Sequence, residues 1–304
     1  MGRRKILLLV NPTGGVRNGL NILENIKPIF EAGGIELEII ETKYAGHAKD
    51  IARAMEIDKF ESLCLVGGDG TMHEAINGMY TRKDNKRIPI GLIPAGTGNS
   101  LMHDFNCLEP TVAAKWIING YSKKIDLAKI NMEHKVVYAF NIVGWGMITD
   151  INLRAHGVRW MGENRYTYAA LMEIMSHKQR HAKLSYGGKT YDEKFTFILG
   201  NMTKFTGSAM KMGPKAKLDD GLIDLSIVRN ASRKQMMNLF PKIFTGEHIY
   251  SDILEYKQVD GYSIIPDEHD PLNLDGETIG STPIELKVLR ESLEVFTSKE
   301  IAEN

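Results

Sequence analysis

The chain of 304 residues has little of several features that often identify a function. It has two cysteines, Cys64 and Cys107, a number typical of proteins kept in a reducing compartment. Basic and acidic residues balance at 38 each, so no net positive charge attracts nucleic acid. No apolar run approaches the ~18 residues that cross a membrane, and the run at residues 6–10 is too short for a signal peptide. We therefore expect a cytoplasmic protein without a nucleic-acid partner.

Several common site motifs are also absent from the sequence. There is no GxxxxGK followed by Ser or Thr, which excludes a P-loop, and no complete GxGxxG, which disfavours a dinucleotide site of the Rossmann type. No CxxC or HExxH sequence and no dense group of histidines and cysteines indicates zinc. A nucleotide site in this chain would have to be of another kind.

The first part of the chain alternates short apolar runs with segments of helical spacing. The apolar runs lie at residues 6–10, 35–40, 63–66 and 88–93. Because strands that alternate with helices form parallel sheets, we expect an α/β domain in which the turns after the strands lie at one edge. We assign residues 1–127 to this domain.

The pattern changes near residue 125. Strand-like runs follow at residues 135–143, 182–186, 195–199 and 222–228, separated by turn sequences such as "YGGKTYDE". They predict a second, mostly antiparallel domain at residues 128–304, whose extreme C-terminus could return to the first domain.

Two helices are expected within the second domain. One covers residues 164–177, and the other begins at Ser232, where Gln235 completes a capping box. Both carry Met, Leu and aromatic residues at helical spacing. Such a stripe belongs either to the core or to a surface that contacts lipid.

The turn "LVGGDGTMHEAING" combines glycines with a single carboxylate, Asp69, where a strand meets a helix. Glycines expose backbone N–H groups at the positive end of the helix dipole, which favours a phosphate, although a tight turn with Asp69 as N-cap is the alternative. Three more turns rich in Gly or Thr follow strands of the same sheet, at residues 11–15, 42–47 and 94–99. Together they indicate a nucleotide cleft. Asp69 would there hold a metal ion or accept a proton, because a carboxylate repels phosphate.

Five ordered motifs resemble the diacylglycerol kinase and sphingosine kinase superfamily: "NPTGG", "GGDGTMHEAINGM", "IPAGTGNS", "KLDDGLIDLSIVR" and "LDGE". The second of these and the stretch "WGMITDINLRAHGVRWMGENRYTY" are most similar to the sphingosine and ceramide kinase branch. The resemblance covers nearly the whole chain. It implies an ATP-dependent lipid kinase with two domains: an α/β domain like that of phosphofructokinase and NAD kinase, and a C-terminal β-sandwich domain, with ATP between them.

The resemblance also implies which residues contact the nucleotide. An arginine pair suits a transferring phosphoryl group because it neutralises charge through parallel hydrogen bonds. The implied set comprises the four turns, two such arginines and a glycine of the late "LDGE" motif, namely Asn11, Gly14, Gly15, Thr42, His47, Gly67, Gly68, Gly70, Thr71, Gly96, Thr97, Gly98, Arg159, Arg165 and Gly276.

Catalysis falls to carboxylates by the same resemblance. Asp69 matches the residue usually assigned as catalytic base or metal holder. Asp275 and Glu277 match the acidic pair from which bacterial diacylglycerol kinases draw their base, so the identity of the base stays open. One Mg²⁺ would accompany ATP. A separate structural Mg²⁺ site of the bacterial branch, with a plain hairpin turn as the alternative, is matched by Lys217, Asp220 and Leu222.

The acceptor lipid is less determined. Sphingosine kinases carry two aspartates, two residues apart, after the "WG" sequence, and the second recognises the sphingoid head group. Here the positions read Asp150 and Asn152. Because asparagine carries no charge for an ammonium group, this departure favours a neutral acceptor such as diacylglycerol or ceramide, and Asp150 could still orient a hydroxyl.

A lipid acceptor implies a cytoplasmic enzyme that associates transiently with a membrane surface, and a homodimer is also considered. Two other readings stay open at this point. The first is a small-molecule kinase like NAD kinase, which shares the GGDG turn. The second is a lipid- or nucleotide-binding protein that has lost catalysis.

Overall fold

The computed structural model describes residues 4–13, 18–207 and 210–303. The chain divides into two compact units, one formed by Met1–Ile125 with Glu291–Asn304 and the other by Asp126–Arg290. Two long strands, β5 (Ser122–Met132) and β15 (Ile284–Phe296), belong partly to each unit. The last residues of the chain are therefore part of the first unit.

The first unit alternates strands with helices. In chain order its elements are β1 (Lys5–Val10), α1 (Gly19–Ala32), β2 (Glu36–Glu41), α2 (His47–Ala54), the 3₁₀ turn η1 (Ile57–Lys59), β3 (Ser62–Gly67), α3 (Asp69–Tyr80), β4 (Ile90–Pro94), α4 (Ser100–Asp104), α5 (Pro110–Asn119) and, at the C-terminus, α9 (Lys299–Glu303).

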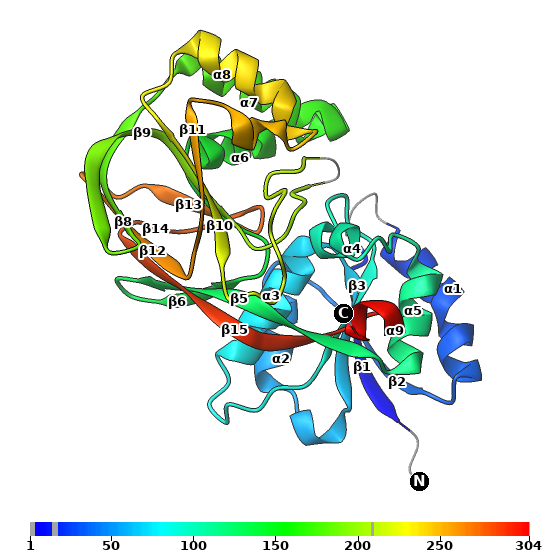
Figure 1. Cartoon of the computed structure of the whole chain (residues 1–304). Helices are drawn as coiled ribbons and strands as arrows, with labels where there is room; N and C mark the ends of the chain where they lie inside the picture. The colour runs from blue at the N-terminus through cyan, green and yellow to red at the C-terminus, as the bar shows by residue number, and fades with distance from the viewer. Residues whose placement is uncertain (1–3, 14–17, 208–209, 304) are drawn as a thin grey trace. The chain divides into compact units, whose positions relative to one another are not determined.

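These strands form a parallel sheet in the order β4–β3–β1–β2, and the end of β15 pairs with β4. Helices α2 and α3 pack together on one face, and α1 and α5 pack on the other (Figure 1). Strand β1 is covered on both sides, so its apolar residues are buried, whereas β2 lies at the edge and is half-exposed. A continuous apolar run is what such a central strand requires.

The second unit consists mainly of antiparallel strands. In chain order its elements are β6 (Val136–Ala139), β7 (Ile142–Gly146), α6 (Met147–Gly157), η2 (Arg159–Asn164), α7 (Arg165–Ser176), β8 (Arg180–Tyr186), β9 (Lys189–Asn201), β10 (Ile223–Arg229), α8 (Arg233–Leu239), η3 (Phe240–Ile243), η4 (Glu247–Tyr250), β11 (Leu254–Val259), β12 (Gly261–Pro266), β13 (Pro271–Leu274) and β14 (Glu277–Ser281).

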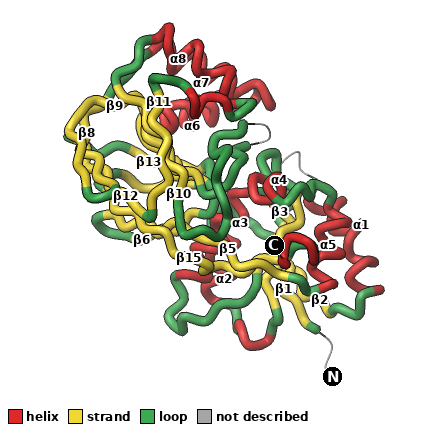
Figure 2. The backbone as a smooth tube through the Cα atoms, in the orientation of Figure 1, coloured by secondary structure: helices red, strands yellow, loops and turns green. Residues whose placement is uncertain are grey.

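Alternation along β9 separates two cores in this unit. Ile198 joins Trp145 and strands of the sandwich interior, whereas Phe197 and Leu199 point to the opposite face and pack with residues of α8. Helices α6, α7 and α8 gather at one end of the unit, and strands make up most of the rest (Figure 2). The predicted capping box of Ser232 and Gln235 is present at the start of α8.

The predicted fold class, an α/β domain followed by a β-sandwich domain, is confirmed. One expected strand, at residues 135–143, is wrong in its detail because it is divided into β6 and β7. The division falls where three consecutive backbone N–H groups, those of Phe140, Asn141 and Ile142, bond to the carboxylate of Asp275 instead of to another strand. A side chain distant in sequence thus interrupts the ladder.

Candidate active site

The four turns that follow β1, β2, β3 and β4 lie at one edge of the first unit's sheet, because the strands are parallel. Hydrogen bonds join them. The Asn11 side-chain N–H donates to the Thr71 hydroxyl at 3.1 Å, and the Thr42 backbone N–H donates to the Val10 carbonyl at 2.8 Å. Gly14 and Gly15, which the sequence assigns to the same edge, lie outside the described residues.

The two glycine-rich turns after β3 and β4 touch one another through their backbones. A Cβ on Gly96 would lie 2.5 Å from the Gly68 Cα, and a Cβ on Gly68 would lie 2.8 Å from the Gly96 Cα. Neither distance is tolerable, so both positions need glycine. The Ala95 N–H also donates to the Gly67 carbonyl at 2.9 Å. The turns form one continuous surface of backbone, on which Gly70, Thr97 and Gly98 remain partly or fully exposed.

Asp69 lies where two helices begin. It is the first residue of α3, and its carboxylate accepts hydrogen bonds from the Ser100 backbone N–H at 2.8 Å and the Ser100 hydroxyl at 3.0 Å, at the start of α4. Asp69 is partly exposed, whereas Ser100 is buried. The carboxylate therefore fixes the two turns relative to each other.

Glu74 is a positioning residue that the sequence did not reveal. Its carboxylate accepts hydrogen bonds from the backbone N–H groups of Gly46 at 2.7 Å and Ala48 at 3.2 Å, and so it supports the turn that leads into α2. In the same turn, the Lys43 N–H donates to Nδ1 of His47 at 3.1 Å. Glu74 and Gly46 are 28 residues apart, and only the packing of α2 against α3 brings them together.

In the second unit, the turn between β13 and β14 holds the late acidic pair. Asp275 has a left-handed backbone with φ of 53°, and its carboxylate accepts from three backbone N–H groups at 2.9 to 3.3 Å. Asp275 is 3% exposed, whereas Glu277 is exposed. The Gly276 N–H donates to the Asn273 side chain at 3.0 Å, which closes the turn. Asp275 thus holds the backbone between β6 and β7 to the turn before β14.

Asp150 and Asn152, the residues expected to bind the acceptor lipid, lie on α6. Both carboxylate oxygens of Asp150 bond to the two Nη atoms of Arg180, each at 2.9 Å, and the Nε of Arg180 lies 3.0 Å from Asp270. Burial lowers the pKa of Arg180, but its bonds to Asp150 and Asp270 outweigh burial and raise the pKa overall, so the guanidinium stays charged. Asn152 is buried and donates to the Gly276 carbonyl at 2.9 Å.

The arginines expected at the phosphates begin consecutive helical segments. Arg159 begins η2 and its side chain lies outside the description, and Arg165 begins α7, with its guanidinium 4.9 Å from the centre of the Tyr166 ring. Arg180, which pairs with Asp150 and Asp270, is an arginine of this region that the sequence did not single out.

The predicted structural metal site forms a tight turn before β10. The Asp220 carboxylate accepts from the Leu222 N–H at 3.0 Å, and the Gly221 N–H donates to Asp126 at 2.6 Å. Within the described ranges, no three His, Cys, Asp or Glu side chains come together as a metal-binding group. A site built from Asp220 and the carbonyls of Lys217 and Leu222 would use only one carboxylate, as Mg²⁺ sites often do.

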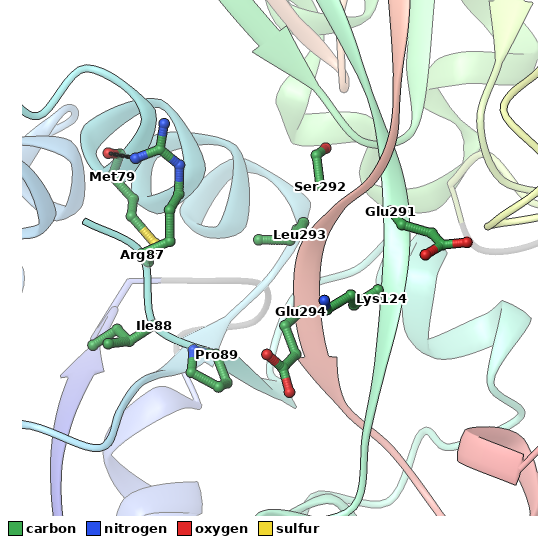
Figure 3. A pocket seen from close by; sticks show the side chains of 9 residues that line it. All are labelled: Met79, Arg87, Ile88, Pro89, Lys124, Glu291, Ser292, Leu293 and Glu294. Atoms are coloured by element: carbon green, nitrogen blue, oxygen red, sulfur yellow. Dashed lines mark hydrogen bonds between the residues drawn. The ribbon is translucent and has the colours of Figure 1, made fainter. Parts of the chain in front are cut away.

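A cavity of about 200 Å³ in the first unit lies away from the glycine-rich turns. Arg87, Ile88 and Pro89 line it just before β4 begins, together with residues 291–294 (Figure 3). The glycine-rich turn follows the opposite end of the same strand. The cavity in Figure 3 is therefore not part of the site formed by the glycine-rich turns.

The chain thus combines an α/β unit that carries glycine-rich turns around Asp69 with a unit of mainly antiparallel strands, and family models assign these parts to a kinase of two domains. A model of the diacylglycerol kinase catalytic domain matches residues 5–130, and a model of the YegS C-terminal NAD kinase beta sandwich-like domain matches residues 141–297. The chain belongs to the diacylglycerol kinase and sphingosine kinase superfamily of lipid kinases. This membership implies the use of ATP.

Curated relatives come from both branches of that superfamily. Sphingosine kinase 1 of Arabidopsis thaliana is 29% identical, over 92% of this chain and 69% of that protein. Diacylglycerol kinase of Bacillus subtilis is 28% identical, over 99% of this chain and 98% of that protein. The crystal structure of a diacylglycerol kinase from Bacillus anthracis shares 23% identity and a TM-score of 0.82 over 98% of both chains, which shows a common fold. The lipid kinase prediction is confirmed over the NAD kinase alternative.

Proposed function

We propose that this chain transfers the γ-phosphoryl group of ATP to a primary hydroxyl of a long-chain lipid: diacylglycerol, a sphingoid base or ceramide. The observation that carries the proposal is the contact of two glycine-rich turns, in which Asp69, the first residue of α3, bonds to Ser100, the first residue of α4. Backbone N–H groups at such helix ends attract phosphate, and a carboxylate beside a phosphate serves as base or metal ligand.

The nucleotide would lie on the turns of the first unit. Asn11, Thr71, Gly68 and Gly96 would contact its phosphates, and Thr42 and His47 would border it, with Glu74 fixing the latter turn through Gly46. When bound, Mg²⁺ would neutralise charge on the phosphates. Asp69 offers the oxygen ligands that Mg²⁺ prefers. Arg159 and Arg165 would add positive charge.

Asp69 is our choice of general base, ahead of the pair Asp275 and Glu277. A base must reach the hydroxyl whose proton it takes. Asp69 is partly exposed, whereas Asp275 is buried and bonded to three backbone N–H groups. Glu277 is exposed at the start of β14, and its carboxylate makes no hydrogen bond or ion pair with other described residues. We therefore assign Asp275 to support of the turn, and we do not assign the general base to Glu277.

Labelled ATP with a panel of lipids in mixed micelles tests this function. We expect a phosphorylated lipid from at least one of diacylglycerol, ceramide and a sphingoid base, and no transfer to NAD. Product formation should require Mg²⁺, because the ion neutralises the triphosphate. Phosphorylation of NAD alone, or ATP binding without transfer to any lipid, would refute the proposal.

A lipid acceptor requires an apolar approach, and we propose that α7 provides it at a membrane surface. Its residues Tyr168, Leu171, Met172 and Met175 are 36 to 58% exposed, which rules out a core role for these four. By contrast, the apolar residues Met236 and Leu239 of α8 are buried, as a core stripe would be. No helix within the described ranges is long and apolar enough to cross a bilayer. The chain would act from the cytoplasm and bind the surface transiently.

Basic residues flank the exposed face of α7 and suit an anionic membrane. Arg233 of α8 donates to the Met175 carbonyl at 2.9 Å, and Lys178 and Lys234 lie within a few residues of these two positions. We therefore propose that the exposed face of α7 binds an anionic membrane surface. The structural Mg²⁺ at Lys217, Asp220 and Leu222 and the homodimer considered from the sequence remain proposals that the vesicle experiment does not address.

Replacing both Met172 and Met175 by Glu should weaken binding to anionic vesicles at least about tenfold, because each Met contributes apolar burial worth roughly 1.5–3 kcal/mol when fully inserted. Co-sedimentation measures the bound fraction. Leu108→Glu is the matched control, since Leu108 is 49% exposed in the first unit. Equal losses for the control and the double variant, or no loss in either, would rule out α7 as the membrane face.

A further inference from the structure

The Asp150 carboxylate is already occupied by a cation from its own chain. Arg180 donates two hydrogen bonds to it in the side-by-side geometry that guanidinium and carboxylate favour, each at 2.9 Å. The side chains of Arg180 and Asp150 are only 20% and 13% exposed. An ammonium group would have to displace Arg180 to bind this carboxylate.

Arg180 is itself held from a second side. Its Nε lies 3.0 Å from the Asp270 carboxylate, just before β13. Three nitrogens of one guanidinium are thus committed to two carboxylates from different elements, α6 and the approach to β13. Displacing the Arg180 guanidinium would therefore break its pairs with both Asp150 and Asp270.

Two residues further along α6, Asn152 presents an amide where a carboxylate would be unfavourable. Its Nδ2 donates to the Gly276 carbonyl oxygen at 2.9 Å, so the orientation of the amide is fixed. Its Oδ1 is buried without a hydrogen-bond partner among the described residues. An aspartate here would place a negative oxygen against the Gly276 carbonyl, an arrangement that needs a cation between them.

We propose that Arg180 and Asn152 make this chain specific for a neutral acceptor alcohol, such as diacylglycerol or ceramide, and that Arg180 excludes sphingoid bases by occupying Asp150. This inference rests on the proposed lipid kinase function. Oδ1 of Asn152 is a hydrogen-bond acceptor without charge, which suits a hydroxyl donor. An ammonium finds neither a free carboxylate at Asp150 nor a charge at Asn152.

Substrate competition between dioctanoylglycerol and a sphingoid base of matched chain length, in the same mixed micelles, tests the proposal. The measured quantity is the ratio of kcat/KM for the base to that for the neutral lipid. The wild-type ratio should be below about one tenth, because an unmet charge costs at least a factor of ten. A wild-type preference for the base would overturn the proposal.

The decisive variant is the double substitution Arg180→Gln with Asp270→Asn. It removes one positive and one negative charge, so the net charge of the cluster stays the same while Asp150 becomes the group that carries it. The ratio should rise at least about tenfold. Asn152→Asp should raise it as well. Arg154→Gln is the matched control, because Arg154 also lies on α6 and pairs with a carboxylate, Glu173, at 2.5 Å. An unchanged ratio in the double variant would overturn the role of Arg180.

Calorimetric titration of the same micelles into each protein separates this inference from the proposed function. If no lipid is phosphorylated, the kinase proposal fails, and the binding preference still decides the specificity. Tighter binding of the neutral lipid by the wild type, reversed in the double variant, supports the role of Arg180. Tighter binding of the base by the wild type contradicts it. If Arg180 had only a structural role, the double variant would bind both lipids more weakly by the same factor. The ratio of the two affinities would then stay unchanged, and this result would also contradict the proposal.

Discussion

Asp69→Asn should lower turnover with the preferred lipid by ~10²–10⁴-fold, the range that general-base catalysis usually provides. The amide has the shape of the carboxylate. Its oxygen can still accept from the Ser100 N–H, and its nitrogen can donate to the Ser100 hydroxyl, so the junction of α3 and α4 keeps both hydrogen bonds. The substitution therefore removes the charge and the basic oxygen and leaves the scaffold in place.

Steady-state kinetics with saturating ATP and a melting curve measure the two consequences separately. The melting temperature should stay close to that of the wild type, while kcat falls. Ser100→Ala is the control, since it removes one hydrogen bond to Asp69 and keeps the carboxylate. It should reduce turnover far less than Asp69→Asn. If Asp69→Asn retains more than about a tenth of wild-type turnover, Asp69 is not the base.

Asp275→Ala should destabilise the second unit by several kcal/mol. The carboxylate is the acceptor for the backbone N–H groups of Phe140, Asn141 and Ile142, and it is buried. Each buried donor left unsatisfied costs roughly 1–3 kcal/mol. Urea unfolding monitored by tryptophan fluorescence reports this loss well, because Trp145 lies in the core of the same unit.

Glu277→Ala provides the comparison for this prediction. Glu277 is exposed in the same turn, and surface substitutions usually change stability by less than about 0.5 kcal/mol. A variant Asp275→Ala that unfolds at the wild-type urea concentration but loses turnover at least a hundredfold would assign the base to Asp275 instead of Asp69. The experiments on Asp69 and Asp275 therefore both test which of the two carboxylates is the general base.

The sequence predicted the elements of the first unit well because their signals are local. A short apolar run such as residues 6–10, closed by Asn11 and Pro12, favours a strand covered on both faces, and parallel strands place the turns that follow them at one edge. Cys64, within the third of these apolar runs, is buried, and burial raises the pKa of its thiol to about 12. Signals of this kind need only a few neighbouring residues.

Helical spacing predicted the helices but not their surroundings, because spacing alone does not say what covers a face. The sequence left the apolar stripes of both helices open between the core and a surface that contacts lipid. Tyr168 and Met175 of α7 are exposed, whereas Met236 and Leu239 of α8 are buried. The same residue types therefore ended in different environments. Which one applies depends on the neighbouring elements, and these are set by the packing of the whole unit.

By itself the sequence determined the fold class, the superfamily and the glycine-rich turns around Asp69, because period, turn chemistry and ordered motifs are properties of short segments. Only the tertiary structure showed that Gly68 meets Gly96, that Glu74 supports Gly46, and that Arg180 occupies Asp150. The last two contacts join residues 28 and 30 positions apart. Their geometry depends on which helix faces and strand registers come together, and no local pattern encodes that for a single side chain.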